Sequence, residues 1–79
     1  MRNTFVAVYR DKAGISHDVQ FESLDDAMAF LRAHIERIRD AVAGEVHEYE
    51  PKHRRPRTLA ECHEIRRVAS FTLADVAQP

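Results

Sequence analysis

Residues 15–31 read I-S-H-D-V-Q-F-E-S-L-D-D-A-M-A-F-L, and the spacing of their apolar residues changes partway along. The first part alternates in polarity, with Ile15, His17, Val19 and Phe21 on one side, as is typical of a half-buried strand. From Leu24 onward the apolar residues recur at steps of four and three, which predicts an amphipathic helix. The centre of the expected fold is therefore a strand followed directly by a helix.

That helix is predicted to span residues 24–43. Ser23 suits the N-cap position, and Asp25 and Asp26 suit the positive end of the helix dipole. Gly44 stands where a glycine often ends a helix. The apolar stripe that should face a sheet consists of Leu24, Met28, Leu31, Ile35, Ile38 and Val42.

The other elements follow from strand-forming and turn-forming residues. Thr4–Arg10 is rich in β-branched and aromatic residues, and Gly14 permits the turn of a hairpin that leads to the alternating strand. Thr58 and Glu61 have the spacing of a capping box. We therefore predict strands at 4–10, 15–22 and 67–73 (Ala69, Phe71 and Leu73 inward), a weak edge strand at 45–50, a loop at 51–57 and a short helical turn at 59–63.

Together these elements predict a single α+β domain over residues 1–79. The order β-β-α-β-(short α)-β describes an antiparallel sheet of three to four strands with the long helix packed on one face. Strand 4–10 is apolar on both faces, so Val6 and Val8 must meet the segment at Thr58, a second copy of the chain or a partner. Val6 and Val8 are therefore candidate interface residues.

The positive charge is concentrated in residues 51–57, P-K-H-R-R-P-R, which hold four of the 12 Lys and Arg residues and no acid. All 13 acids lie elsewhere, against eight bases, so the rest of the chain has a net charge of −5. Basic side chains at this density suit contacts with carboxylates or phosphates. The candidate partner-binding residues of this segment are Lys52, Arg54, Arg55 and Arg57.

Three interpretations of the basic segment are open: an acidic protein surface as partner, a nucleic acid, or a solvated loop that serves only solubility. A nucleic-acid backbone requires a broad positive surface, whereas acids flank this segment, and no aromatic residue interleaves its arginines. The pattern therefore favours a protein partner, and a homodimer is a further alternative. A second, phosphate-mimicking surface is expected at Asp18, Glu22, Asp25 and Asp26.

No motif predicts catalysis, a metal or a cofactor. The five histidines and the single cysteine, Cys62, lack the spacing of a zinc site, although His17 and His34 would be neighbours if the helix crosses strand 15–22. Cys62 has no positioned base, and two glycines are too few for a phosphate-binding loop. We expect a protein that is not an enzyme and has no cofactor. Its lone cysteine and short apolar runs favour a cytoplasmic location without a membrane span.

Two resemblances follow from these features. The hairpin with Phe21–Leu31, F-E-S-L-D-D-A-M-A-F-L, resembles the hairpin-then-helix module of the arm-type DNA-binding domain of phage integrases. That family reads DNA with a basic sheet face, and its DNA-binding role is not carried over because the matching positions here are Ser16, Asp18, Gln20 and Glu22. In length, α+β build and lack of catalytic motifs, the chain is also similar to small phage and mobile-element anti-defence proteins of the anti-CRISPR type, without a shared motif.

The second resemblance implies an inhibitor of a bacterial defence complex, or of another nucleic-acid-handling complex, that acts by covering a protein surface. The function predicted from the sequence is accordingly a non-enzymatic protein-binding module. A small nucleic-acid-binding regulator that uses the loop at 51–57 is the alternative.

Overall fold

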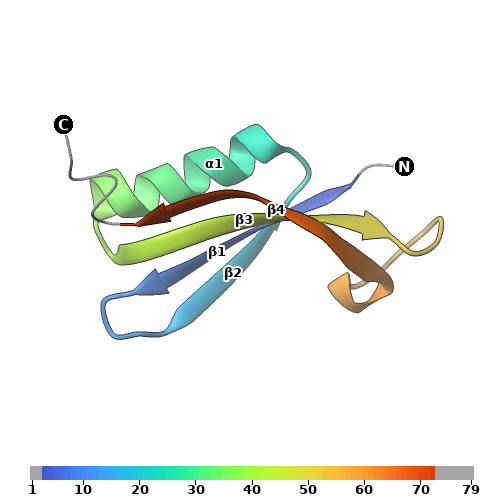
Figure 1. Ribbon diagram of the computed structural model, residues 1–79, viewed down its shortest axis with the longest axis horizontal. Coiled ribbons are helices and arrows are strands. Elements are labelled where there is room, and N and C mark those ends of the chain that lie inside the picture. Colours follow the sequence, from blue (N-terminus) through green and yellow to red (C-terminus); the bar gives the residue numbers. More distant parts are fainter. Residues whose placement is uncertain (1–2, 73–79) are drawn as a thin grey trace.

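A computed structural model describes residues 3–72, which form a four-stranded antiparallel sheet with one helix packed on one face (Figure 1). The strand order is β2-β1-β3-β4. The predicted α+β class, with a helix on one face of an antiparallel sheet, is confirmed. The elements are β1 (Thr4–Asp11), β2 (Ser16–Phe21), α1 (Leu24–Arg32), η1 (Ala33–Ile38), β3 (Ala41–Pro51), η2 (Leu59–Glu61) and β4 (Cys62–Thr72).

The β1–β2 hairpin forms where the sequence predicts it. Its turn contains Gly14 in a left-handed conformation (φ 85°), which glycine adopts without a steric penalty. The carboxylate of Asp11 accepts hydrogen bonds from the amides of Ala13 and Ile15, both at 2.9 Å. Asp11 therefore closes the turn through its side chain as well as its backbone.

The helix begins as predicted but ends at Ile38, not at residue 43. At its start, the hydroxyl of Ser23 accepts the amide of Asp26 at 3.1 Å. Its last turns widen into the π-helix η1, and Arg39 then takes the left-handed conformation (φ 61°) that the sequence assigned to Gly44. The apolar residues after position 40 fit a strand as well as a helix, which explains why the helical stripe seemed to continue.

Residues 41–51 form β3, one of the two inner strands, instead of a helix end and a weak edge strand. β3 pairs with β1, from a distant part of the chain, on one side and with β4, its hairpin partner, on the other. Gly44 lies within it, and a Cβ at this position would be 3.0 Å from Leu31 Cδ2. The glycine therefore permits close approach of helix and sheet, and it does not cap the helix.

β4 begins at Cys62 and not at residue 67, so it is longer than predicted. Its polar first half is held by cross-strand contacts, among them the bond from Arg66 Nε to Glu48 Oε1 at 2.9 Å. Ala69 and Phe71 pack against the core as expected, and Leu73 lies outside the described residues. The short helical turn predicted at 59–63 is a single 3-10 turn that ends at Glu61.

The core lies between the helix and the face of the sheet that carries Ala7 and Tyr9. The opposite face, here called the open face, carries Val6 and Val8 on β1. By the strand register it also carries Asp18 and Gln20 on β2 and Glu45 and His47 on β3. The buried core cluster consists of Ala7, Tyr9, Ala27, Leu31, Ile35, Ala41 and Val46.

Candidate protein-interaction loop

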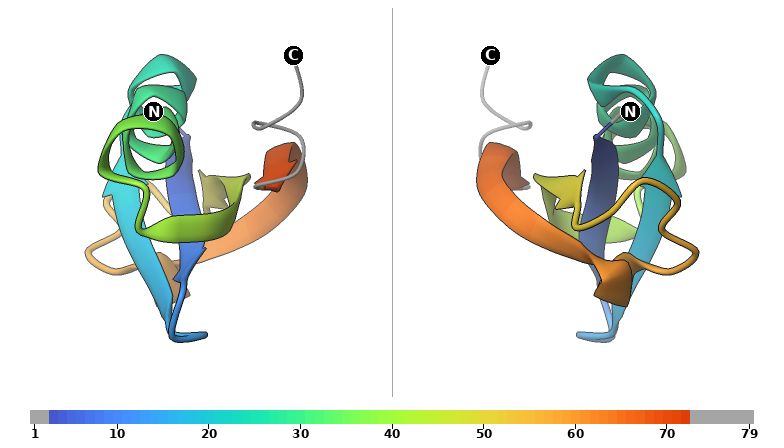
Figure 2. Two further views of the ribbon diagram at one scale, coloured as in Figure 1. Left: turned by 90° about the vertical axis from the view of Figure 1, so that its left-hand side faces the viewer. Right: turned by 90° about the vertical axis from the view of Figure 1, so that its right-hand side faces the viewer.

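The basic loop, residues 52–57, follows β3 and leads to η2 at the tip of the β3–β4 hairpin (Figure 1). Figure 2 shows the segment between β3 and β4 extending toward the side of β2 before it returns to β4. The structure gathers the four predicted partner-binding bases on this projecting segment, and all four are exposed: Lys52, Arg54, Arg55 and Arg57.

Glu61 organises the backbone of the basic loop. Its carboxylate accepts hydrogen bonds from the amides of Arg57 and Thr58, which hold the pKa of Glu61 below its ordinary value, the Arg57 bond most strongly. The amide of Lys52 donates to the Glu61 carbonyl at 2.9 Å. The glutamate half of the predicted capping box is thus formed, whereas the Thr58 hydroxyl makes no capping bond.

His53 adds a second connection within the loop. Its Nδ1 accepts the amide of Arg55 at 3.3 Å, so in the neutral ring the proton is on Nε2, which lies 3.6 Å from Glu61 Oε2. The ammonium group of Lys52 donates to the carbonyl of Ala60 at 3.3 Å. The loop is therefore ordered by contacts within it and with η2.

The guanidinium groups of Arg54, Arg55 and Arg57 form no ion pair with any residue between 3 and 72. The acids closest to the loop in the sequence have other partners. Glu61 binds the loop amides, and Glu50 Oε2 lies 3.4 Å from His63 Nε2. The basic loop therefore presents uncompensated positive charge that can receive carboxylates or phosphates.

The four acids expected to form a second surface do not share one face. Asp18 lies opposite Val8 in the β1–β2 register, which places it on the open face. Asp25 and Asp26 are in the first turn of α1, on the other side of the sheet, and Glu22 lies between the two elements. All four are exposed, but the single phosphate-mimicking surface is corrected to separate acids on two sides.

Val6 and Val8 differ in exposure although both lie on the open face. Val6 is 2% exposed and offers no surface to a partner, which corrects its place as an interface candidate. Its strand neighbours Thr4 and Gln20 line a cavity of about 60 Å³ together with residues 56–59. The segment around Thr58, one of the three covers expected from the sequence, therefore lies over this part of the sheet.

Val8 remains accessible. It is half-buried in the floor of a shallow hollow of about 230 Å³ in the open face, bordered by Arg10 and Glu45. Next to the hollow, Glu45 Oε2 lies 3.0 Å from His47 Nε2 and 3.6 Å from Arg67 Nη1.

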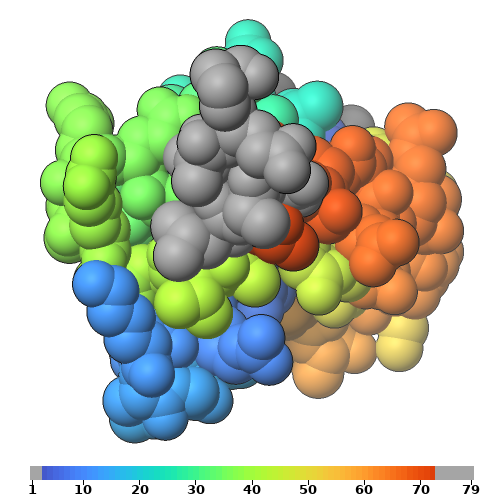
Figure 3. All heavy atoms as spheres, turned by 60° about the vertical axis from the view of Figure 1, so that its left-hand side comes forward, coloured from blue at the N-terminus to red at the C-terminus, as the bar shows by residue number. Residues whose placement is uncertain are grey.

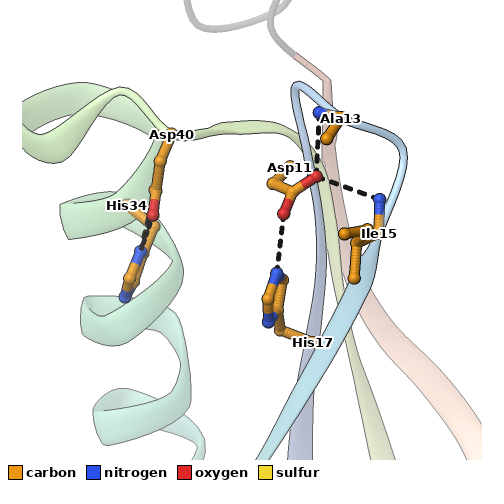
Figure 4. A network of polar contacts seen from close by, with 6 residues as sticks. All are labelled: Asp11, Ala13, Ile15, His17, His34 and Asp40. Atoms are coloured by element: carbon orange, nitrogen blue, oxygen red, sulfur yellow. Dashed lines mark hydrogen bonds and ion pairs between the residues drawn. The ribbon is translucent and has the colours of Figure 1, made fainter.

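A second cluster of titratable side chains lies at the other end of the molecule, where the β1–β2 hairpin and the end of the helix come together (Figure 3). The ring of Tyr9 is stacked between those of His17 and His34, with centroid separations of 4.7 and 4.5 Å. His17 Nε2 lies 2.8 Å from Asp11 Oδ2, and His34 Nδ1 lies 2.9 Å from Asp40 Oδ1 (Figure 4). The expected proximity of the two histidines is realised through Tyr9, which the sequence did not identify.

This cluster connects the hairpin to the helix end. Burial, and then the charges of Asp40 and Asp11, raise the pKa of the Tyr9 hydroxyl above its ordinary value. The hydrogen bonds of Asp11 with His17 and with the turn amides hold the pKa of that carboxyl below its usual value. Within residues 3–72, no three His, Cys, Asp or Glu side chains are placed to hold a metal ion. Because the ring stack joins side chains of β1, β2 and the helix end, we interpret the cluster as a structural contact.

No protein family, curated protein or solved structure matches this chain. In the described part of the chain, no helix is long and apolar enough to cross a membrane.

Proposed function

We propose that this chain is a protein-binding module whose basic loop contacts an acidic surface of its partner. The observation that carries the proposal is the anchoring of the loop by Glu61. Hydrogen bonds to the Glu61 carboxylate hold the loop backbone, while Arg54 and Arg55 stay exposed and unpaired within residues 3–72. Part of the entropic cost of ordering the loop is thus met before binding, which favours affinity.

The distribution of charge supports a protein partner over a nucleic acid. The basic residues occupy one narrow segment, while exposed carboxylates, Glu50 on β3 and Glu64 on β4, stand on the strands next to it. A nucleic-acid backbone would meet repulsion from those acids, whereas a protein surface with matching acids and bases would not. The proposed mode of action is occlusion of the partner's surface without a catalytic step, as the anti-defence resemblance implies.

The test is affinity capture from a bacterial lysate with the tagged protein as bait. One variant replaces Lys52, Arg54 and Arg55 with alanine. A matched control replaces three exposed bases outside the loop, Lys12, Arg32 and Arg37. We expect at least one protein that the wild type and the control retain, that the loop variant loses, and that nuclease treatment does not release.

A second measurement addresses the alternative directly. The purified protein is titrated against duplex and single-stranded DNA and RNA at two salt concentrations. Binding at about micromolar affinity that weakens steeply with salt, and that the loop variant loses, would overturn the proposal in favour of a nucleic-acid-binding regulator. Capture of the same proteins by the wild type and the loop variant would also contradict it. The Glu61→Gln variant, which keeps every base, should bind more weakly because its loop is less ordered.

A further inference from the structure

The two edges of the sheet are protected to different degrees. Opposite β4, the register shifts between Val46 and His47 and again between Glu48 and Tyr49, and such bulges discourage pairing with another chain. β2, in contrast, pairs with β1 along all of its six residues without a shift, and it contains no proline, lysine or arginine. Within residues 3–72, β2 is therefore the less protected edge, where a further strand can be added.

Exposed apolar side chains are concentrated along this edge. Ile15 is 58% exposed, Val19 38% and Leu24 36%, and the three lie just before β2, within it and just after it. Ile15 and Val19 alternate with the polar residues of the strand and point toward the helix side of the sheet. A strand added at β2 would cover these side chains as well as pair the backbone.

The hydrogen-bond pattern of the hairpin determines which residues of β2 direct their backbone groups away from β1, toward a strand added at this edge. The amide of Asp11 bonds to the carbonyl of Ile15 at 2.9 Å, so residues alternating from Ile15 direct their backbone groups toward β1. Ser16, Asp18 and Gln20 consequently direct theirs away from the sheet. A second strand must place its own outward residues opposite these three.

For a second copy of the chain, charge selects among the symmetric registers centred on Asp18, Val19 or Gln20. Centring on Asp18 places two aspartates directly opposite each other, and centring on Gln20 places Asp18 opposite the partner's Glu22. Both arrangements are destabilising because like charges face each other. Centring on Val19 places Asp18 opposite the partner's Gln20 and the two Val19 side chains in contact, with no like charges opposed.

The same register brings unpaired opposite charges together on the open face. Gln20 and Arg57 line the same small cavity, and the Arg57 guanidinium has no ion pair with any residue between 3 and 72. The partner's Asp18, placed opposite Gln20, would lie beside this guanidinium, and the contact occurs twice by symmetry. On the helix side, the partner's Ile15 would lie opposite Ser23 and next to the exposed Leu24.

We propose that the chain forms a two-fold symmetric dimer through antiparallel pairing of the two β2 strands about Val19, which joins the two sheets into one. Arg57 and the partner's Asp18 form ion pairs on one face, and Ile15, Val19 and Leu24 are covered on the other. Lys52, Arg54 and Arg55 remain available to a different partner, so the dimer does not depend on the proposed binding function.

The first test measures mass by light scattering over protein concentrations up to about millimolar. The wild type should approach twice its 9.1 kDa mass. Val19→Asp should remain a monomer with unchanged far-ultraviolet circular dichroism, because it places two carboxylates at the symmetry axis. Ile65→Asp is the matched control: Ile65 is also an exposed apolar residue, at 45%, but lies on the other edge and should not affect the dimer.

The second test examines the register and does not require Val19→Asp to fold. Opposed residues of a non-hydrogen-bonded pair have Cα atoms about 4.5 Å apart, within the range of a disulfide. With Cys62→Ser as background, Val19→Cys should cross-link the dimer under mild oxidation, and Ile65→Cys should not. The Asp18→Arg variant should weaken the dimer, and adding Arg57→Asp should restore it.

Three outcomes would overturn the proposal. One is a monomer at every concentration. Another is a dimer that Val19→Asp leaves intact, and the third is cross-linking through Ile65→Cys instead of Val19→Cys. None of these measurements involves another protein, so their failure is distinct from failure of the proposed binding function.

Discussion

The close contact between Gly44 and Leu31 can be tested by a double-mutant cycle. A methyl group at position 44 would lie 3.0 Å from Leu31 Cδ2, 3.4 Å from Cδ1 and 3.5 Å from the carbonyl oxygen of Val8. Leu31 is 0% exposed, so its side chain has little room to move. Gly44→Ala should therefore destabilise the protein, although alanine normally suits an ordered backbone better than glycine.

The effect of Gly44→Ala on the free energy of unfolding is the sum of two opposing contributions. Overpacking destabilises the protein by about 1–3 kcal/mol, and the smaller entropy of the unfolded chain stabilises it by about 0.4–1 kcal/mol. The net loss of stability should be about 0.5–2 kcal/mol. Leu31→Val, which shortens the side chain, should cost about 1 kcal/mol by itself. In the Leu31→Val background, Gly44→Ala should cost almost nothing. The coupling free energy between the two changes should therefore be about 0.5–2 kcal/mol.

The assay is urea unfolding followed by circular dichroism at one protein concentration, with the m-values compared to confirm two-state behaviour. A chain of this length has a free energy of unfolding of about 4–12 kcal/mol, so both single variants should remain folded. If the two changes add to within about 0.3–0.5 kcal/mol, or if Gly44→Ala by itself stabilises the protein, the steric account of Gly44 is refuted.

Two further predictions concern single residues. Arg39→Gly should raise the thermal midpoint, by about 0.5–1 kcal/mol in free energy, because it relieves a left-handed non-glycine residue (φ 61°), whereas the control Arg37→Gly in the helix should lower it. The hydrogen bonds from Asn3 and Arg66 hold the pKa of Glu48 below its ordinary value, so this carboxylate stabilises the fold above its unfolded pKa and the effect is lost as pH falls through the folded pKa. Urea midpoints measured between pH 7 and pH 3 should therefore fall less for Glu48→Gln than for the wild type, and an equal fall in both would contradict this role.

The first 38 residues could be predicted well because their signals are local. The alternation of β2, the turn at Gly14 and the cap at Ser23 each involve residues close together in the chain, and each is present in the structure. The sequence also indicated the capping-box spacing of Glu61, but not that its carboxylate would accept the amide of Arg57 and order the basic loop.

The second half could be predicted less well because it depends on distant partners. The apolar residues 41–43 fit the period of a strand as well as that of a helix. They join a strand because β1 and β4 supply hydrogen-bond partners on both sides. Gly44 resembles a helix cap in sequence, whereas its role comes from Leu31 on the facing helix. The Tyr9 stack likewise joins His17 and His34 from separate elements.

By itself, then, the sequence determined the class of fold, the order of its first elements and the concentration of bases in residues 52–57, since periodicity, capping and composition are properties of short segments. Only the tertiary structure decided where the helix ends, which strands are inner, which edge is less protected and on which face each acid lies. These features depend on contacts between residues far apart in the chain, and the energies of such contacts cannot be inferred from the pattern of a short segment.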